Sequence, residues 1–311
     1  MIINLEKNPF LKSLKGFLNA IKLPFLENIS LYELSHFYIS GIMKGALSYR
    51  AAAVSWSFFM ALFPFALFIL NLIPFIPIKD FQKDFLQFVS DAVPPNTYGA
   101  IANIIDDILH NSQSGLLSSG FILSVFLMTN GVNAIMSGFE TSEHVIEKRA
   151  YFRQYFVALC LSLLLTFILI VSVSTIIIFE VIIQKTIIQD VLSENISDKI
   201  SIIQTSRYLF ILAMIIFVIA TLFRFGIRQT RKRAFITVGT IFTTVLIVIT
   251  SYFFGIWVVK FSKYNELYGS IGTLLIVMFY LWINCMILLL GFELDASIAK
   301  LKQHPEPNPV L

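Results

Sequence analysis

The sequence predicts an all-α membrane protein, a bundle of six transmembrane helices with both termini in the cytoplasm. Of its 311 residues, 57% are hydrophobic and only 14% are charged, whereas a soluble domain carries about 25% charged residues. Six apolar windows are each long enough to cross roughly 30 Å of hydrocarbon. Lysine and arginine gather in alternate loops between these windows, as they do in multi-pass proteins of the bacterial cytoplasmic (inner) membrane.

The predicted spans lie at about residues 51–73, 115–139, 155–183, 207–225, 235–259 and 271–294. In lipid every backbone amide needs a partner within the protein, so runs of this length that are nearly free of charge form helices. Strands are excluded because no window alternates polar with apolar residues. The chain then divides into N-terminal interfacial helices at 1–46, one transmembrane domain at 47–298 and a cytoplasmic tail at 299–311.

The orientation follows from the loops that carry most of the positive charge, because such loops stay in the cytoplasm. The basic residues of this side are Lys7, Lys12, Lys15, Lys22, Lys44, Arg50, Lys148, Arg149, Arg153, Arg224, Arg228, Arg231, Lys232, Arg233, Lys300 and Lys302. A bundle of five or seven spans would place one of these clusters outside. Six spans with cytoplasmic termini satisfy the asymmetry.

Two stretches before the first span predict interfacial helices. Between Phe10 and Ile21 apolar residues recur at helical spacing with lysines among them, which is typical of a helix lying on anionic lipid. Membrane lipids, and the inner leaflet in particular, are therefore expected partners. A second helix is expected to begin at Ser30, because Ser30 and Glu33 have the spacing of a capping box.

The external segment 78–114 is amphipathic and is broken at Pro94 and Pro95. Two interpretations fit this pattern. The segment is either a surface-lying helical hairpin that only packs, which is the commoner case, or a cap that gates the bundle.

Polar residues within the spans mark a candidate pathway. Its members are Ser55, Ser57, Pro64 and Asn71 in the first span, Thr129, Asn130 and Asn133 in the second, and Asn284 in the last. Proline removes a backbone donor, so the first span is expected to be kinked or interrupted, and transport proteins use such breaks to line a path. The alternative is that these residues only join neighbouring helices, which is the commoner use of polar groups in a membrane.

Four ionisable residues fall at one depth, near the cytoplasmic ends of the spans. They are Arg50, Glu140, Glu293 and Asp295. Ionisable groups in such positions are costly unless they are paired. We therefore expect them to form one cytoplasmic-side charge cluster.

No pattern of a soluble enzyme is present. The four histidines stand alone, without a second ligand at the spacing of a metal site, and there is no phosphate-binding loop or nucleophile elbow. Cys160 and Cys285 lie in apolar runs, where a thiol behaves as a small hydrophobic group. The basic residues are confined to separate loops, which argues against nucleic acid as a partner. We expect no catalytic residue, metal or cofactor.

Two segments resemble a known family. YRAAAVSWSFFMALFPFALFIL at 49–70 and YGSIGTLLIVMFYLWINCMILLLGFELDASI at 268–298 are similar to signatures of the YihY/virulence factor BrkB family, and the basic loop RFGIRQTRKRAF fits the connection between them. The chain departs from the family at Val238, where a proline usually precedes the glycine. The resemblance implies a six-helix inner-membrane protein linked to serum resistance and envelope integrity. Some members carry the label ribonuclease BN, for which these residues offer no support.

Two functions remain open from the sequence. The first is the movement of a lipid, lipid precursor or small solute across the membrane, or the support of envelope integrity. The alternative is a non-transporting membrane scaffold that binds envelope partners through its basic cytoplasmic face. An intramembrane enzyme is the weakest reading, because neither cysteine has a base near it in the sequence.

Overall fold

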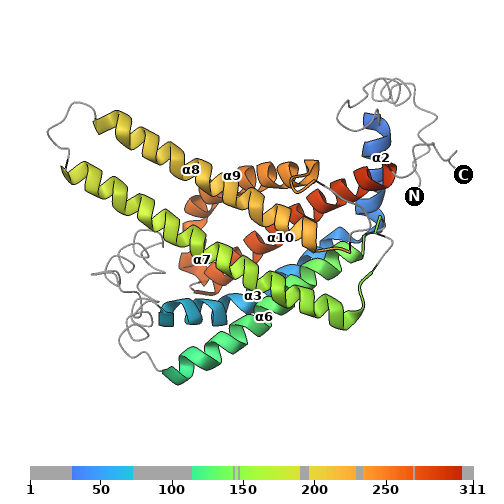
Figure 1. Cartoon of the computed structure of the whole chain (residues 1–311), viewed down its shortest axis with the longest axis horizontal. Coiled ribbons are helices and arrows are strands. Elements are labelled where there is room, and N and C mark those ends of the chain that lie inside the picture. Colours follow the sequence, from blue (N-terminus) through green and yellow to red (C-terminus); the bar gives the residue numbers. More distant parts are fainter. Residues whose placement is uncertain are drawn as a thin grey trace, which may run out of the picture.

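The computed structural model describes residues 30–72, 114–142, 144–145, 148–189, 196–228, 234–268 and 270–302. These residues form seven helices and no strand, which confirms the all-α membrane fold (Figure 1). The predicted N-terminal basic helix and nearly all of the external segment 78–114 lie outside the described residues.

The helices are α2 (Leu31–Lys44), α3 (Leu47–Leu72), α6 (Ser114–Glu140), α7 (Tyr151–Gln189), α8 (Ile196–Phe225), α9 (Val238–Tyr268) and α10 (Ser270–Leu301). Five of them, α6 to α10, are long and apolar enough to cross a membrane by themselves. A sixth span arises if α2 and α3, which meet at a bend of 61°, are taken together. Every predicted span coincides with one of α3 and α6 to α10.

The helix α2 begins where the sequence predicts. The Ser30 hydroxyl accepts from the Glu33 amide at 3.1 Å, and the Glu33 carboxylate accepts from the Ser30 amide at 3.2 Å, so the capping box is confirmed. The helix ends at Gly45, and the next residue, Ala46, has a φ of +46°, which side chains other than glycine rarely adopt. This residue turns the chain sharply from α2 into α3.

The first span was expected to be kinked or interrupted, and of these two outcomes an interruption at Pro64 is wrong. α3 continues as helix through Pro64 to Leu72. Proline removes one backbone donor, and a helix of this length keeps its remaining hydrogen bonds. The break lies instead at Gly45 and Ala46, between α2 and α3.

The six long helices form a closed ring. α3 packs on α6, α6 on α7, α7 on α8, α8 on α9, α9 on α10, and α10 returns to α3. Few contacts cross the ring, and these join α6 to α10. α2 packs against α10 at one end of the bundle, as Figure 1 shows at its right-hand side.

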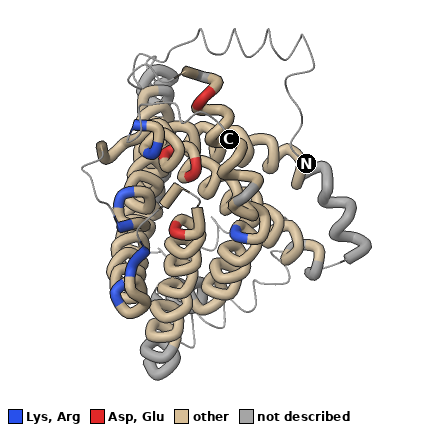
Figure 2. Tube along the Cα trace, turned by 90° about the vertical axis from the view of Figure 1, so that its right-hand side faces the viewer, with Lys and Arg blue, Asp and Glu red and all other residues tan. Residues whose placement is uncertain are grey.

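One end of the ring holds the described core and most of the described basic residues. Here α6, α8 and α10 end and α3, α7 and α9 begin, and we call it the basic end. Its lysines and arginines include Arg50, Lys148, Arg149, Arg153, Arg224, Arg228, Lys300 and Lys302. Figure 2 views the bundle from this end and shows Lys and Arg along one side, with Asp and Glu nearer the middle.

Burial is unevenly distributed along the helices. In α7 no described residue beyond Ile168 is buried, in α8 none before Ile219, and in α9 none after Thr244. In α10 the positions from Leu274 to Asn284 are likewise not buried. The described helices therefore pack densely over the half of the bundle nearest the basic end.

The helices α9 and α10 meet at glycines in this half of the bundle. The Thr243 hydroxyl donates to the Gly239 carbonyl at 2.7 Å, beside Gly291 of α10. A Cβ atom at Gly291 would overlap the Thr243 hydroxyl, and one at Gly239 would overlap Asp295 and the Gly291 backbone. Only glycine permits the two backbones to approach this closely.

We expect Gly291→Ala to destabilise the protein by about 1–3 kcal/mol, because the added methyl group forces α9 and α10 apart. Thermal unfolding in detergent measures the change. Gly255→Ala is the matched control, since a Cβ atom there meets nothing within 4 Å. Equal melting temperatures for the two variants would contradict the close packing.

Cysteine labelling tests which end of the bundle faces the cytoplasm. With Cys160 and Cys285 replaced by serine, a cysteine at Ala234 should react with a membrane-impermeant maleimide only after the cells are permeabilised. A cysteine at Lys199, which the sequence places outside, should react in intact cells. The opposite pattern would mean that the basic end faces the periplasm.

Candidate functional site

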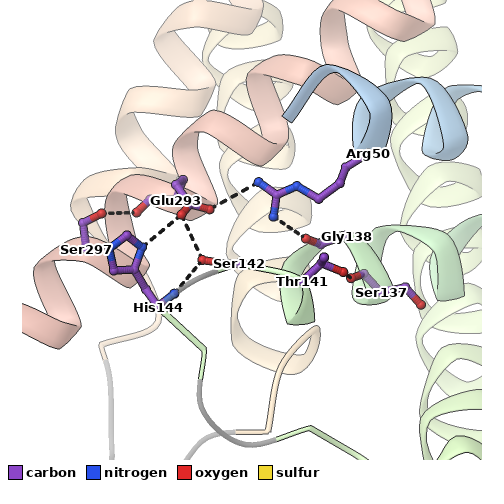
Figure 3. A network of polar contacts seen from close by, with 8 residues as sticks. All are labelled: Arg50, Ser137, Gly138, Thr141, Ser142, His144, Glu293 and Ser297. Carbon is purple, nitrogen blue, oxygen red and sulfur yellow. Dashed lines mark hydrogen bonds and ion pairs between the residues drawn. The ribbon is translucent and has the colours of Figure 1, made fainter. Parts of the chain in front are cut away.

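A buried carboxylate, Glu293 of α10, stands at the centre of the polar contacts at the basic end. The side chain is 0% exposed. Its Oε1 accepts from the Ser142 hydroxyl at 3.0 Å and lies 3.0 Å from the His144 Nδ1, while its Oε2 lies 3.5 Å from an Arg50 nitrogen (Figure 3). The Ser142 hydroxyl also accepts from the His144 amide at 3.2 Å. We call Arg50, Ser142, His144 and Glu293 the Glu293 cluster.

The Arg50 guanidinium enters the cluster from the first turn of α3. Its side chain is 7% exposed. One terminal nitrogen donates to the Gly138 carbonyl of α6 at 2.9 Å, and the other faces Glu293. The Nε atom is buried and has no hydrogen-bond partner. Arg50 thus ties α3 to α6 and α10 with part of its hydrogen-bonding capacity unused.

The helix α2 covers the cluster through two glycines. A Cβ atom at Gly41 would overlap the Glu293 carboxylate and the His144 ring, and one at Gly45 would lie 3.0 Å from an Arg50 nitrogen. The Phe37 ring of the same helix is 6.0 Å from the His144 ring. Because of these glycines, the backbone of α2 lies directly against the charged groups.

Glu140 and Asp295 do not join Arg50, contrary to the expected single cluster. The Glu140 carboxylate accepts from the Arg149 amide at 3.3 Å, and the Arg149 guanidinium donates to the carbonyls of Gly226 at 3.2 Å and Ile227 at 2.7 Å. Burial lowers the pKa of Arg149, and the nearby Glu140 opposes this shift. Glu140 and Arg149 therefore fix the segment before α7 to the end of α8.

The Asp295 carboxylate holds the start of α9. It accepts from the Gly239 amide at 2.7 Å and from the Thr237 hydroxyl. The first amides of a helix lack partners within the helix, and the positive end of its dipole favours a carboxylate there. Glu140 and Asp295 thus bind donors near the ends of helices, rather than joining Arg50 and Glu293 in the predicted cluster.

Three aromatic rings pack beside the Glu293 cluster and close the centre of the bundle. Phe139 of α6 and Phe292 of α10 are stacked at 4.1 Å, and Phe223 of α8 meets both edge-on at 5.7 and 5.8 Å. All three side chains are buried, and a Cβ atom at Gly226 would press on Phe139. Together with the Glu293 cluster, these rings form what we call the plug.

The first-span residues of the predicted polar pathway bond within their own helix. Ser55 and Ser57 each donate to a carbonyl of α3 at 3.0 Å. Pro64 lies within α3, and the side chain of Asn71 lies outside the described residues.

The remaining pathway residues lie on α6 and α10. Thr129 pairs with Ser162 of α7 at 3.1 Å, and Asn130 accepts from the Tyr155 hydroxyl at 3.2 Å. Asn284 donates to the Tyr280 carbonyl at 2.8 Å, and Asn133 is half-buried on α6. The structure does not gather these side chains into one path, and the contacts of Thr129 and Asn130 join α6 to α7.

Sequence reasoning missed Ser142, His144 and Gly41. His144 has no second ligand at the spacing of a metal site, and the 149 residues that separate it from Glu293 give no local signal. Within the part of the chain that the structure describes, no group of three or more His, Cys, Asp and Glu residues is placed to hold a metal ion. The expectations of no metal and no catalysis stay predictions.

Comparison with known proteins places this arrangement in a family. The family model described as "Virulence factor BrkB" matches residues 38–309, which include the second half of α2 and the whole plug. The chain belongs to the virulence factor BrkB family. The resemblance seen in the two sequence signatures is thereby confirmed.

Two relatives cover nearly the full length of the BrkB-family chain. A protein of Bacillus subtilis named "Putative ribonuclease-like protein YfkH" is 25% identical over 260 residues, which is 84% of this chain and 93% of YfkH. A UPF0761 membrane protein of Coxiella burnetii is 23% identical over 277 residues, which is 87% of this chain and 94% of that protein. No solved structure matches the chain.

The Glu293 cluster predicts a strong dependence on charge balance. Arg50→Gln should destabilise the protein by about 3–5 kcal/mol, because it leaves a buried carboxylate with less compensation. Adding Glu293→Gln should restore part of that loss. Unfolding in detergent measures both, and additive losses in the double variant would contradict the pairing.

Proposed function

We propose that this BrkB-family protein moves a lipid, a lipid precursor or a small solute across the bacterial inner membrane. The observation that supports the proposal is the uneven packing of the ring. All six long helices bury residues near the basic end, where the plug lies, whereas the described parts of α7, α8 and α9 bury none farther away. This is the pattern of a carrier closed on one side.

The arrangement of the helices agrees with such a carrier. In Figure 1 the pair α7–α8 and the pair α3–α6 diverge as they leave the plug. The side chains of the diverging parts are largely apolar, and several are exposed, such as Phe121, Phe167 and Tyr208. An apolar molecule with a polar head is therefore the class of cargo that we favour.

The plug would act as the cytoplasmic gate in this proposal. Opening it requires that α2 and α3 shift relative to α6 and α10, because Arg50 and Glu293 connect these helices. Packed aromatic rings and a buried ion pair have discrete arrangements, which suits two-state gating.

Reconstitution tests the proposal. Vesicles that contain the purified protein should equilibrate fluorescent phospholipids between leaflets, or take up a solute, faster than vesicles that contain an unrelated helical membrane protein. The panel should include anionic and zwitterionic lipids and lipid-linked precursors. Activity at the level of the control across lipids and solutes would contradict the proposal.

A second function is supported by the exposed charges of the basic end. Lys148 and Arg228 are exposed there, which suits a scaffold that binds acidic partners. This function predicts stable co-purification of an envelope enzyme that is lost when Arg231, Lys232 and Arg233 are neutralised. Retention of every partner by the neutralised variant would contradict it.

A further inference from the structure

We propose that Arg50 is the binding residue for a phosphate group on the transported molecule, which it takes up in place of Glu293. The inference rests on the proposed transport function and names its substrate class, a phosphate-bearing lipid or lipid precursor. It starts from the one buried side-chain atom of the described residues that lacks a hydrogen-bond partner, the Nε of Arg50.

The hydrogen bonds of Arg50 are incomplete. A guanidinium has five N–H donors in a planar fork, and here one terminal nitrogen binds the Gly138 carbonyl at 2.9 Å while the other reaches Glu293 only at 3.5 Å. The Nε hydrogen is buried and unused. A buried charged donor without an acceptor costs free energy. A phosphate can supply the missing acceptor, because two of its oxygens can accept hydrogen bonds from the planar guanidinium together.

Glu293 is able to release Arg50 without losing its other partners. Its Oε1 keeps the Ser142 hydroxyl and the His144 ring nitrogen, both at 3.0 Å, whereas only Oε2 faces Arg50. The contact to Arg50 is the longest of the three. Exchange of this one contact for a phosphate leaves the carboxylate hydrogen-bonded and the arginine better satisfied than before.

The helix α2 supplies the route to Arg50. It covers the cluster with Gly41 and Gly45, so no side chain of these residues blocks the approach once the helix tilts. The tilt has a natural pivot at Gly45 and Ala46, where the chain bends by 61°. Ile39 and Met43 on α2 are exposed apolar residues, 54% and 77% respectively, which suits a helix that borders lipid tails.

Arg50→Lys tests the assignment, because lysine keeps the positive charge but lacks Nε and the planar fork. The purified full-length protein in a neutral detergent is titrated with phosphatidylglycerol, with phosphatidylcholine and with inorganic phosphate, and binding is followed by thermal shift and native mass spectrometry. We expect the wild type to bind phosphatidylglycerol and Arg50→Lys to bind it at least tenfold more weakly. Arg153→Gln, an exposed arginine of the same end, should bind it as the wild type does.

A second variant separates binding from folding. Glu293→Gln frees Arg50 and should bind phosphatidylglycerol at least as tightly as the wild type, even if its melting temperature is lower. If inorganic phosphate competes with phosphatidylglycerol, the site is supported and the phosphate group alone is sufficient for binding. If it does not compete, the lipid tails contribute to binding. Wild-type affinity in Arg50→Lys, or equal binding of phosphatidylcholine in wild type and variant, would overturn the assignment.

The transport assay is interpreted separately from the binding assay, so that the site and the transport function can fail independently. Arg50-dependent binding without lipid movement would refute the transport function and keep the site. Lipid movement at the wild-type rate in Arg50→Lys would refute the site and keep the transport function.

Discussion

The burial of Glu293 is the constraint on which the basic end of the molecule depends. An ionised carboxylate that loses its contact with water must be compensated by donors within the protein. Here the donors come from separate elements: Arg50 from α3, Ser142 just after α6, and His144 from the segment beyond. The carboxylate therefore fixes how these elements meet.

Glycines lie at two close helix contacts of the basic end, one against the Glu293 cluster and one between α9 and α10. α2 contacts the charged groups with its backbone, at Gly41 and Gly45, and α9 contacts α10 at Gly239 and Gly291. Small residues allow helices in a membrane to approach closely and to exclude lipid from polar groups. The plug is thus a tightly packed layer, in contrast to the less buried part of the ring.

Much of the fold was predictable because a membrane restricts the choices. Apolar windows of sufficient length predicted the long helices, and the spacing of Ser30 and Glu33 predicted the start of α2. Pro64 does not interrupt α3, which was one of the two expected outcomes, since a long helix tolerates one missing donor. The actual break at Ala46 depends on a backbone conformation that no residue type there announces.

The site was predictable only in part, because depth in the membrane does not determine which groups meet. Arg50 and Glu293 lie at the same depth and contact each other. Glu140 and Asp295 lie at that depth too, but they accept hydrogen bonds from the Arg149 amide before α7 and the Gly239 amide at the start of α9. Those contacts depend on how the helices are rotated. That rotation is set by packing among residues distant in sequence, such as Phe139, Phe223 and Phe292.

The pairing of Arg50 with Glu293 also has a consequence for biogenesis. The two residues are 243 positions apart, so the arginine leaves the ribosome long before its carboxylate is synthesised. Until the last helix enters the bilayer, this cation must stay at the aqueous interface, held by water or by lipid headgroups. The contact that joins the first long helix to the last can therefore form only after the whole bundle has been synthesised.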